Sequence, residues 1–352
     1  MALENLPDDA AVTGALVAGI AVLLLFACAL ALRAMHALGK RQLARLREQW
    51  WPVFAEVVTS EHFAEDAALP ALRRGHKKVL LREWSRFRSL VQGQATISLN
   101  ALAERLGLLQ MAKRRMRRRS INDRLLAVRV LGQVRDRASW DAIDAMVEDP
   151  NIAVSVTAAT ALVDIDADRA IPRIIPLIAR FPRWPRTQVG RLLNRAGPDI
   201  VSTRLCREIA DAPDDEAVRL LQYIESAYPG DSNAVAERLL KTRDDPAVLS
   251  AALKAACGRI CPERIAELAR HDVWYVRMQA AALLGRAGKP EDLTALEPLL
   301  SDTEWWVRYR TAQAIVASPY IGPQALRRIA ARQTDRYARD ILRQAMAEKG
   351  LA

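Results

Sequence analysis

Apolar residues recur at helical spacing along most of the chain after residue 120. In the stretch DVWYVRMQAAALLG, residues 272–285, the apolar positions Val276, Ala280, Leu283 and Leu284 stand at i, i+4, i+7 and i+8. This spacing places them on one face of an α-helix. A shorter helical pattern precedes this stretch and another follows it, so the sequence predicts helices that come in pairs.

The pairs return at a nearly constant interval. If the first apolar position of each second helix is taken as a marker, successive markers are 29, 35, 29, 30, 28, 31 and 31 residues apart. The markers are Leu125, Val154, Val189, Val218, Val248, Val276, Val307 and Ala338. This interval is the length of two short helices and two turns. A single pair would leave an apolar face in water, so we expect about eight helical hairpins stacked into a solenoid over residues 121–352.

Polar residues and prolines indicate where these helices begin. Acidic or hydroxyl residues precede several second helices and can cap them by accepting hydrogen bonds from free amides; they are Asp149, Asp215, Asp245, Asp272 and either Ser301 or Asp302. Ser301 and Glu304 also have the spacing of a capping box. Proline fits best in the first turn of a helix, which predicts further starts at Pro150, Pro172, Pro198, Pro246, Pro262, Pro290 and Pro323.

One segment near the N-terminus has a different pattern, because residues 10–32 contain no charge at all. These residues would form a helix about 34 Å long, enough to cross the ~30 Å hydrocarbon layer of a bilayer. We therefore expect a transmembrane helix at residues 10–34, preceded by a short outer segment at residues 1–9. A cleaved signal peptide is disfavoured, because its usual basic start is missing.

The charges on either side of this segment set its expected orientation. No basic residue precedes it, whereas Arg33, Lys40, Arg41, Arg45 and Arg47 follow it. By the positive-inside rule the N-terminus then lies outside and the large C-terminal part lies in the cytoplasm.

Net charge is concentrated in the next segment, residues 35–120, which we expect to be a basic, helical, juxtamembrane region. Residues 36–120 hold 18 basic and 7 acidic residues, whereas residues 121–352 hold 33 and 31. The densest group consists of Lys113, Arg114, Arg115, Arg117, Arg118 and Arg119. It would suit the phosphates of anionic lipids or of a nucleic acid, or it forms a solvated face. Trp50 and Trp51 would fit an interfacial aromatic belt only if the helix bends at Pro52.

Composition supports an all-α protein and gives no sign of catalysis. The chain is 51% hydrophobic but only 5% aromatic, which favours packed helices over sheets and disfavours disorder. Its four cysteines and four histidines are scattered, so we expect no metal site. The sequence has no HExxH, GxSxG, glycine-rich phosphate loop or Cys-x-x-Cys motif, and we therefore expect neither an enzyme nor a cofactor.

Two aromatic pairs occupy equivalent places in neighbouring repeats. Trp274 and Tyr275 precede the marker Val276, as Trp305 and Trp306 precede Val307. Aromatic residues at such positions commonly pack between hairpins. Adjacent residues of a helix cannot both face the same neighbour, however, so one of each pair should point outward and be available to a binding partner.

The run of an acidic residue, Val-Arg, Ala-Ala and Leu in residues 272–285 resembles the HEAT-repeat family, in particular the bacterial variety named for phycobilisome lyases. The resemblance extends over about residues 121–347 and is weakest near Val189, where Gly190 replaces the arginine. It implies an all-α fold, an α-α superhelix, with a surface that binds other macromolecules. In this chain we expect the superhelix to follow a single transmembrane helix. The expected partner-binding residues are Trp274, Tyr275, Trp305, Trp306, Tyr309 and Arg310.

These features together predict a single-pass scaffold or adaptor in a bacterial inner membrane. Its cytoplasmic solenoid would bind a protein partner, itself an integral membrane protein or membrane complex, and the basic region would face an anionic lipid surface. An accessory subunit of a multi-span enzyme, such as a glycan synthase or exporter, fits this arrangement. The alternative is a nucleic-acid-binding protein, because some alkylpurine DNA glycosylases are built of HEAT-like repeats. The near-neutral charge of residues 121–352 disfavours that alternative.

Overall fold

A computed structural model describes residues 8–59, 69–256, 260–287 and 292–351. In the first helix the side chains are described at residues 17–30, at Arg33 and from residue 43 onward. The regular elements among the described residues are all helices, which confirms the expected all-α class. The chain divides into two compact units, residues 1–134 and residues 135–352, which we call unit 1 and unit 2.

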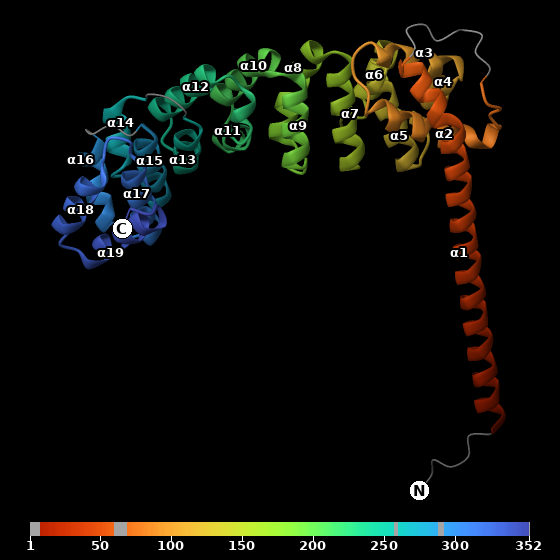
Figure 1. Cartoon of the computed structure of the whole chain (residues 1–352), viewed down its shortest axis with the longest axis horizontal. Coiled ribbons are helices and arrows are strands. Elements are labelled where there is room, and N and C mark those ends of the chain that lie inside the picture. Colours follow the sequence, from red (N-terminus) through yellow and green to blue (C-terminus); the bar gives the residue numbers. More distant parts are fainter. Residues whose placement is uncertain (1–7, 60–68, 257–259, 288–291, 352) are drawn as a thin grey trace. The chain divides into compact units, whose positions relative to one another are not determined.

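Unit 1 consists of one long helix and four shorter ones (Figure 1). In chain order they are α1 (Asp8–Thr59), α2 (Lys77–Arg88), α3 (Ala95–Arg105), α4 (Leu108–Met116) and α5 (Ile121–Gln133), with a short 3-10 turn, η1 (Arg74–His76), before α2. Helix α5 contacts α2 and α4. Its last residue, Gln133, accepts a hydrogen bond from Ser85 at 2.7 Å and donates one to the carbonyl of Ser85 at 3.0 Å. These contacts place the first marker helix in unit 1.

Helix α1 continues through Pro52 without a break. Its C-terminal turns are anchored in unit 1, where Trp50 is 1% exposed and Phe54 is fully buried. The ring of Trp51 meets that of Phe87 edge-on at 5.6 Å. The alternative that placed Trp50 and Trp51 in an interfacial belt is therefore wrong, because the helix does not bend at Pro52 and Trp50 is buried within unit 1.

The side chains described at residues 17–30 of α1 are apolar and exposed. All the side chains described at residues 17–30 are exposed, including Leu25 at 72% and Phe26 at 63%. Within the described part of the chain, no helix combines the length and the hydropathy that crossing a lipid bilayer requires. The other side chains of the expected transmembrane segment, residues 10–16, 31, 32 and 34, lie outside the described ones, as do residues 1–7.

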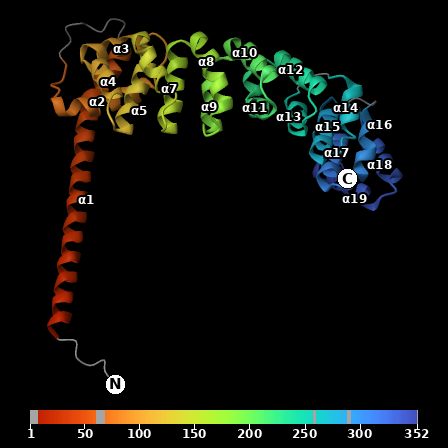
Figure 2. The same cartoon turned by 180° about the vertical axis from the view of Figure 1, so that it is seen from behind.

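Unit 2 is a row of helical hairpins, which both views show stacked side by side (Figures 1 and 2). The first helices of the hairpins are α6 (Trp140–Asp144), α8 (Ala167–Arg180), α10 (Pro198–Asp211), α12 (Pro229–Thr242), α14 (Pro262–Leu268), α16 (Leu293–Leu296) with η5 (Glu297–Ser301), and α18 (Pro323–Arg332). The second helices are α7 (Ile152–Ile165), α9 (Arg186–Ala196), α11 (Asp214–Leu221), α13 (Pro246–Ala255), α15 (Trp274–Ala287), α17 (Trp305–Ala317) and α19 (Arg336–Glu348). The described part of unit 2 also contains two 3-10 turns, η2 (Arg137–Ser139) and η3 (Ile224–Ser226).

The marker positions form much of the core between hairpins. Six of them are fully buried: Val154, Val189, Val248, Val276, Val307 and Ala338. At the other two the predicted phase is off by one residue. Leu126 is buried instead of Leu125, and Ala217 instead of Val218. The buried stripe of a helix depends on the direction from which its neighbours pack, and a repeat interval does not give that direction.

Helix starts follow the expected chemistry at only some positions. Asp245 caps α13 by accepting hydrogen bonds from two amides at 2.9 and 3.0 Å, but α7 is capped by Asn151 and not by Asp149. The capping box of Ser301 and Glu304 is absent, because Glu304 itself precedes α17 and makes no side-chain cap. Proline opens a helix at Pro198, Pro246, Pro262 and Pro323, as predicted. Pro172 instead lies inside α8, and Pro290 is outside the described residues.

Gly285 allows α15 and α17 to approach closely, and this gives a first prediction. A Cβ at this position would lie 2.7 Å from the Cα of Ala314 and closer still to its Cβ. Replacing Gly285 by Ala should therefore force the two helices apart and lower the free energy of unfolding by about 1–3 kcal/mol. Urea unfolding of the full chain in mild detergent measures the change, and hydrogen exchange localises it to α15 and α17.

Gly190 provides the matched control, because it also lies in a second helix but a Cβ there would meet nothing within 4 Å. Replacing Gly190 by Ala should stabilise the chain by up to about 1 kcal/mol, since alanine is the better helix former. Equal effects of the two substitutions would contradict the close approach at Gly285.

Candidate protein-interaction surface

An exposed row of aromatic side chains lies at the starts of three consecutive second helices, α15, α17 and α19. We define the aromatic row as Trp274, Tyr275, Trp305, Trp306, Tyr309 and Tyr337. Trp274 is 37% exposed, Trp305 43% and Trp306 56%, while Tyr275 and Tyr309 are half-buried. The expectation that one member of each pair faces outward therefore understates the exposure at Trp305 and Trp306, where both rings reach solvent.

The rings of the central repeat support one another. Trp305 stacks on Tyr309 with centroids 5.0 Å apart and planes at 12°. Trp306 meets Trp305 edge-on at 4.8 Å. In the preceding repeat Trp274 and Tyr275 meet edge-on at 5.7 Å. Such contacts restrict the rotamers of the rings, so less side-chain entropy is lost when a partner binds.

Tyr337 is the member of the row that the sequence analysis missed. It is 70% exposed and directly precedes the marker Ala338, as Tyr275 and Trp306 precede theirs. The guanidinium of Arg308 lies 5.8 Å from its ring centroid, within the range of a cation–π contact. The sequence signal for this residue was its place directly before the marker Ala338.

Tyr309 and Arg310, also predicted to contact the partner, each form a side-chain hydrogen bond within unit 2. The hydroxyl of Tyr309 donates to the carboxylate of Glu348 at 3.1 Å, and this hydrogen bond raises the pKa of Tyr309. Arg310 is exposed and donates to the side chain of Gln313 at 3.1 Å. Both residues lie on α17 beside the exposed rings, so a partner that covers the row would reach them as well.

The arginines that follow the marker valines hold the repeats together. Arg277 donates two hydrogen bonds of 2.7 Å to the carboxylate of Asp302 in the next repeat. It also donates to the carbonyls of His271 and Asp272 in its own loop. Arg308 repeats the second pattern by donating to the carbonyls of the 302–303 loop. The loops that present the aromatic row are therefore tied to the hairpins beneath them.

The predicted phosphate-binding residues divide into two groups in unit 1. Arg115 donates to the buried carboxylate of Asp123 at 2.8 Å, and Arg118 lies 3.8 Å from the same carboxylate. A hydrogen bond from Lys78 and the nearby charge of Arg115 lower the pKa of Asp123, although burial acts in the opposite sense. Arg114, Arg117 and Arg119 are exposed and Lys113 is half-buried. Part of this cluster is thus structural and part of it is accessible.

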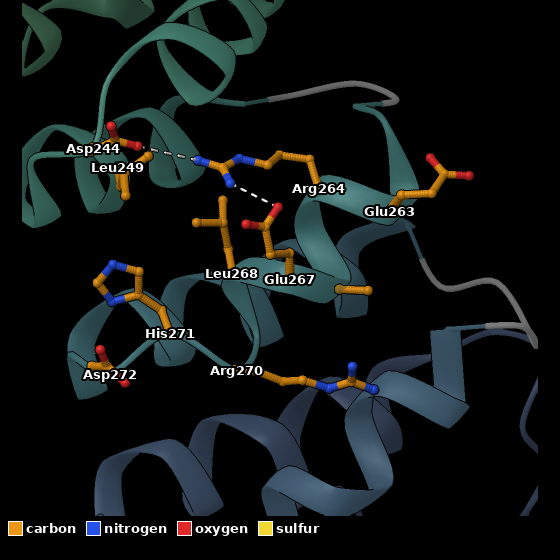
Figure 3. Close-up of a pocket in the computed structure, with 10 residues that line it drawn as sticks. Asp244, Leu249, Glu263, Arg264, Glu267, Leu268, Arg270, His271 and Asp272 are labelled. Atoms are coloured by element: carbon orange, nitrogen blue, oxygen red, sulfur yellow. Dashed lines mark ion pairs between the residues drawn. The ribbon is translucent and has the colours of Figure 1, made fainter.

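A shallow pocket of about 490 Å³ lies before the aromatic row, between α14 and the start of α13. Arg264 bridges it, with ion pairs to Glu267 at 2.7 Å and to Asp244 at 4.0 Å (Figure 3). On another side of the pocket, Nδ1 of His271 accepts a hydrogen bond from the amide of Val273 at 3.0 Å. Arg264 and His271 thus make bonds that stabilise the local structure, and we assign no chemistry to the pocket.

Cys206 is the described cysteine whose environment changes its ionisation. Burial raises the pKa of Cys206 to about 11, which leaves it protonated and weakly nucleophilic at neutral pH. In the described part of the chain, no three His, Cys, Asp or Glu side chains converge as metal ligands would. Cys257 lies outside that part.

Comparison with known proteins identifies the repeats. Residues 233–316 and 261–347 match the family model of HEAT repeats, and among curated proteins none matches this sequence significantly. The crystal structure of Kap121p bound to RanGTP is similar, with a TM-score of 0.50, 12% identity, and coverage of 84% of this chain and 38% of that one. Kap121p bound to Nup53p matches with a TM-score of 0.50, 12% identity, and coverage of 83% and 40%.

This chain thus spans about two fifths of the length of these solved relatives. At 12% identity the likeness concerns the fold alone, which is an α-solenoid. The family match extends over α13 to α18 and most of α12 and α19, and so includes the whole aromatic row. Residues 233–347 therefore carry HEAT repeats, and the likeness to Kap121p supports the fold of an α-solenoid over most of the chain.

Proposed function

We propose that this protein is a membrane-anchored HEAT-repeat scaffold that binds a protein partner through the aromatic row. The observation that carries the proposal is the exposure of large rings at equivalent positions of three consecutive repeats. Single exposed apolar residues are common on protein surfaces, but contiguous ones mark interaction sites. Tryptophan, tyrosine and arginine also dominate the energetics of protein interfaces.

Membrane attachment through α1 is the second part of the proposal. Residues 10–32 carry no charge, and the described side chains between residues 17 and 30 are exposed over the whole surface of the helix. A helix that is apolar on all sides requires either a protein core or lipid around it. The basic residues that follow residue 32 favour a cytoplasmic location for residues 35–352, and we assign the anchor to the inner membrane of a bacterium.

The partner is proposed to be an integral membrane protein or a membrane complex. An anchor of this kind keeps the solenoid at the same surface as such partners and raises their effective concentration. The solved Kap121p structures contain protein partners, namely RanGTP and Nup53p, so solenoids of this fold can hold proteins. A non-catalytic accessory role beside a multi-span enzyme, such as one that makes or exports glycans, fits this arrangement.

Replacing Trp305 and Trp306 together by Ala tests the role of the row. Both rings are exposed, so we expect partner recovery to fall about tenfold or more, while the thermal midpoint changes by less than about 4 °C. The measurement is quantitative mass spectrometry of proteins that co-purify with the full chain from native membranes in mild detergent.

Tyr320 serves as the control, because it is 66% exposed in unit 2 but lies outside the row. Its replacement by Ala should leave partner recovery within about twofold of the wild type. Purification of the wild-type chain without any stoichiometric partner would count against the proposal. If both variants lost the same amount of partner recovery, the partner would bind elsewhere than at the aromatic row.

A further inference from the structure

The first two helices of unit 1 run parallel to each other. Arg47 of α1 donates to the carboxylate of Glu83 in α2 at 2.7 Å. Four residues further along both helices, Trp51 meets Phe87 with centroids 5.6 Å apart. The start of α2 therefore lies beside the part of α1 that precedes Arg47, on the side from which the apolar segment of α1 extends.

Helix α5 continues this parallel arrangement. Lys78 near the start of α2 lies 2.7 Å from Asp123 near the start of α5, and Ser85 further along α2 donates to Gln133 at the end of α5 at 2.7 Å. The C-terminal turn of α4 lies at the same end, because its Arg115 is 2.8 Å from the same Asp123. The starts of α2 and α5 and the end of α4 thus form one end of unit 1, which we call the basic end.

Accessible positive charge gathers at the basic end. Arg114, Arg117 and Arg119 are exposed there, and none of the three forms an ion pair with a described residue. The carboxylate of Asp123 is already shared among Lys78, Arg115 and Arg118. At the opposite end, α2 closes with the exposed Arg86 and the half-buried Arg88, which donates to Asn100. Residues 89–94, which follow α2 there, contain no charge. The three exposed arginines without an ion pair to a described residue therefore lie together at the basic end.

The basic end lies close to where the hydrocarbon layer would end. The two contacts between α1 and α2 join residues that are 36 apart in sequence, so Lys78 lies at the level of residue 42. Residue 42 is ten residues beyond the last uncharged residue of the apolar segment, a distance of about 15 Å along an unbroken helix. The headgroup layer occupies roughly 5–7 Å of this distance. The remaining gap is about one Debye length, before the reach of the arginine side chains is counted.

We propose that the basic end of unit 1 docks onto anionic lipid headgroups of the membrane that α1 enters, with Arg114, Arg117 and Arg119 as the main contacts. This inference rests on the proposed anchor. Each basic residue near an anionic surface strengthens attachment about fivefold, so the three together contribute about 100-fold at low salt. Docking of this kind holds unit 1 in one orientation on the bilayer surface.

The test reconstitutes the full chain into nanodiscs of phosphatidylcholine, with or without phosphatidylglycerol, and measures amide hydrogen exchange. We expect exchange at residues 113–120 to be slowed several-fold in the anionic discs only. High salt should abolish the difference, because it screens the attraction. The triple variant Arg114→Gln, Arg117→Gln, Arg119→Gln should exchange at the same rate in both discs.

A charge-matched control replaces Arg86, Arg129 and Arg343, which are exposed but lie away from the basic end or in unit 2. It should keep the protection in anionic discs. Protection that is equal in both discs, or that survives in the triple variant, would overturn the inference. So would tight binding of duplex DNA at physiological salt that depends on the same three arginines. The anchor is tested separately by washing native membranes with alkaline carbonate. If α1 spans the bilayer, the full chain should stay with the membranes; release of the chain would contradict the anchor.

Discussion

Replacing Trp50 by Ala is expected to lower the free energy of unfolding of unit 1 by about 3–5 kcal/mol. Its ring is 1% exposed and lies beside Phe54, with centroids 6.2 Å apart. Removing it would leave a cavity at the point where α1 joins the bundle, and the surrounding helices can close such a cavity only in part. Thermal unfolding of the detergent-solubilised chain measures the loss, and hydrogen exchange of α2 localises it.

Trp306 supplies the comparison for this prediction, because it is the same residue type but 56% exposed. Its replacement by Ala should cost less than about 1 kcal/mol. If Trp50 instead lay in a membrane-interface belt, its loss would weaken membrane association and leave the unfolding of unit 1 unchanged. That pattern would contradict the buried position.

Replacing Asp302 by Ala is expected to destabilise the junction between α15 and α17 by about 3 kcal/mol. The carboxylate accepts two hydrogen bonds from Arg277, and the two side chains are only 7% and 14% exposed. It also accepts a hydrogen bond from the amide of Glu304 at 2.9 Å. Without it a largely buried guanidinium loses its counter-ion, which costs more than a surface pair. Urea unfolding at neutral pH measures the loss.

The Arg277–Asp302 pair also makes the stability of the protein depend on pH, and the pKa shift of Asp302 gives the direction. Burial acts to raise the pKa of Asp302, but the bonds from Arg277 and Glu304 outweigh it and lower the pKa below its ordinary value. The stability from this group is therefore complete above the ordinary pKa of about 4 and is lost as the pH falls through the lowered value. The difference in unfolding free energy between the wild type and the Asp302→Ala variant should shrink on acidification below about pH 4.

Asp215 is the matched control for Asp302. It pairs with the equivalent arginine, Arg219, at 2.7 Å, but its side chain is 69% exposed. Its replacement by Ala should change stability by less than about 1 kcal/mol, since solvent screens an exposed pair. Similar losses of unfolding free energy at Asp302 and Asp215 would show that the Arg277–Asp302 pair stabilises the protein no more than an exposed pair does.

The candidate surface was only partly predictable from the sequence. The repeat interval made Trp274 equivalent to Trp305, and Tyr275 equivalent to Trp306. The structure places the three tryptophan rings at the surface. Tyr337 was missed because its neighbours lack a second aromatic residue. The basic cluster was recognised as a run of charge, but a run does not distinguish Arg115, which a buried carboxylate engages, from Arg117, which is exposed. That distinction depends on Asp123, which belongs to the next helix.

By itself the sequence determined the helical class, the repeat interval and the identity of most buried marker positions, because these follow from local periodicity and from the need to cover apolar faces. Tertiary structure alone decided which neighbouring residue is buried at Leu125 and Val218, that α1 continues through Pro52, and that α5 packs in unit 1. It also gathered the starts of α2 and α5 with the end of α4. Each of these outcomes depends on contacts between residues far apart in the chain, whose directions the sequence pattern does not encode.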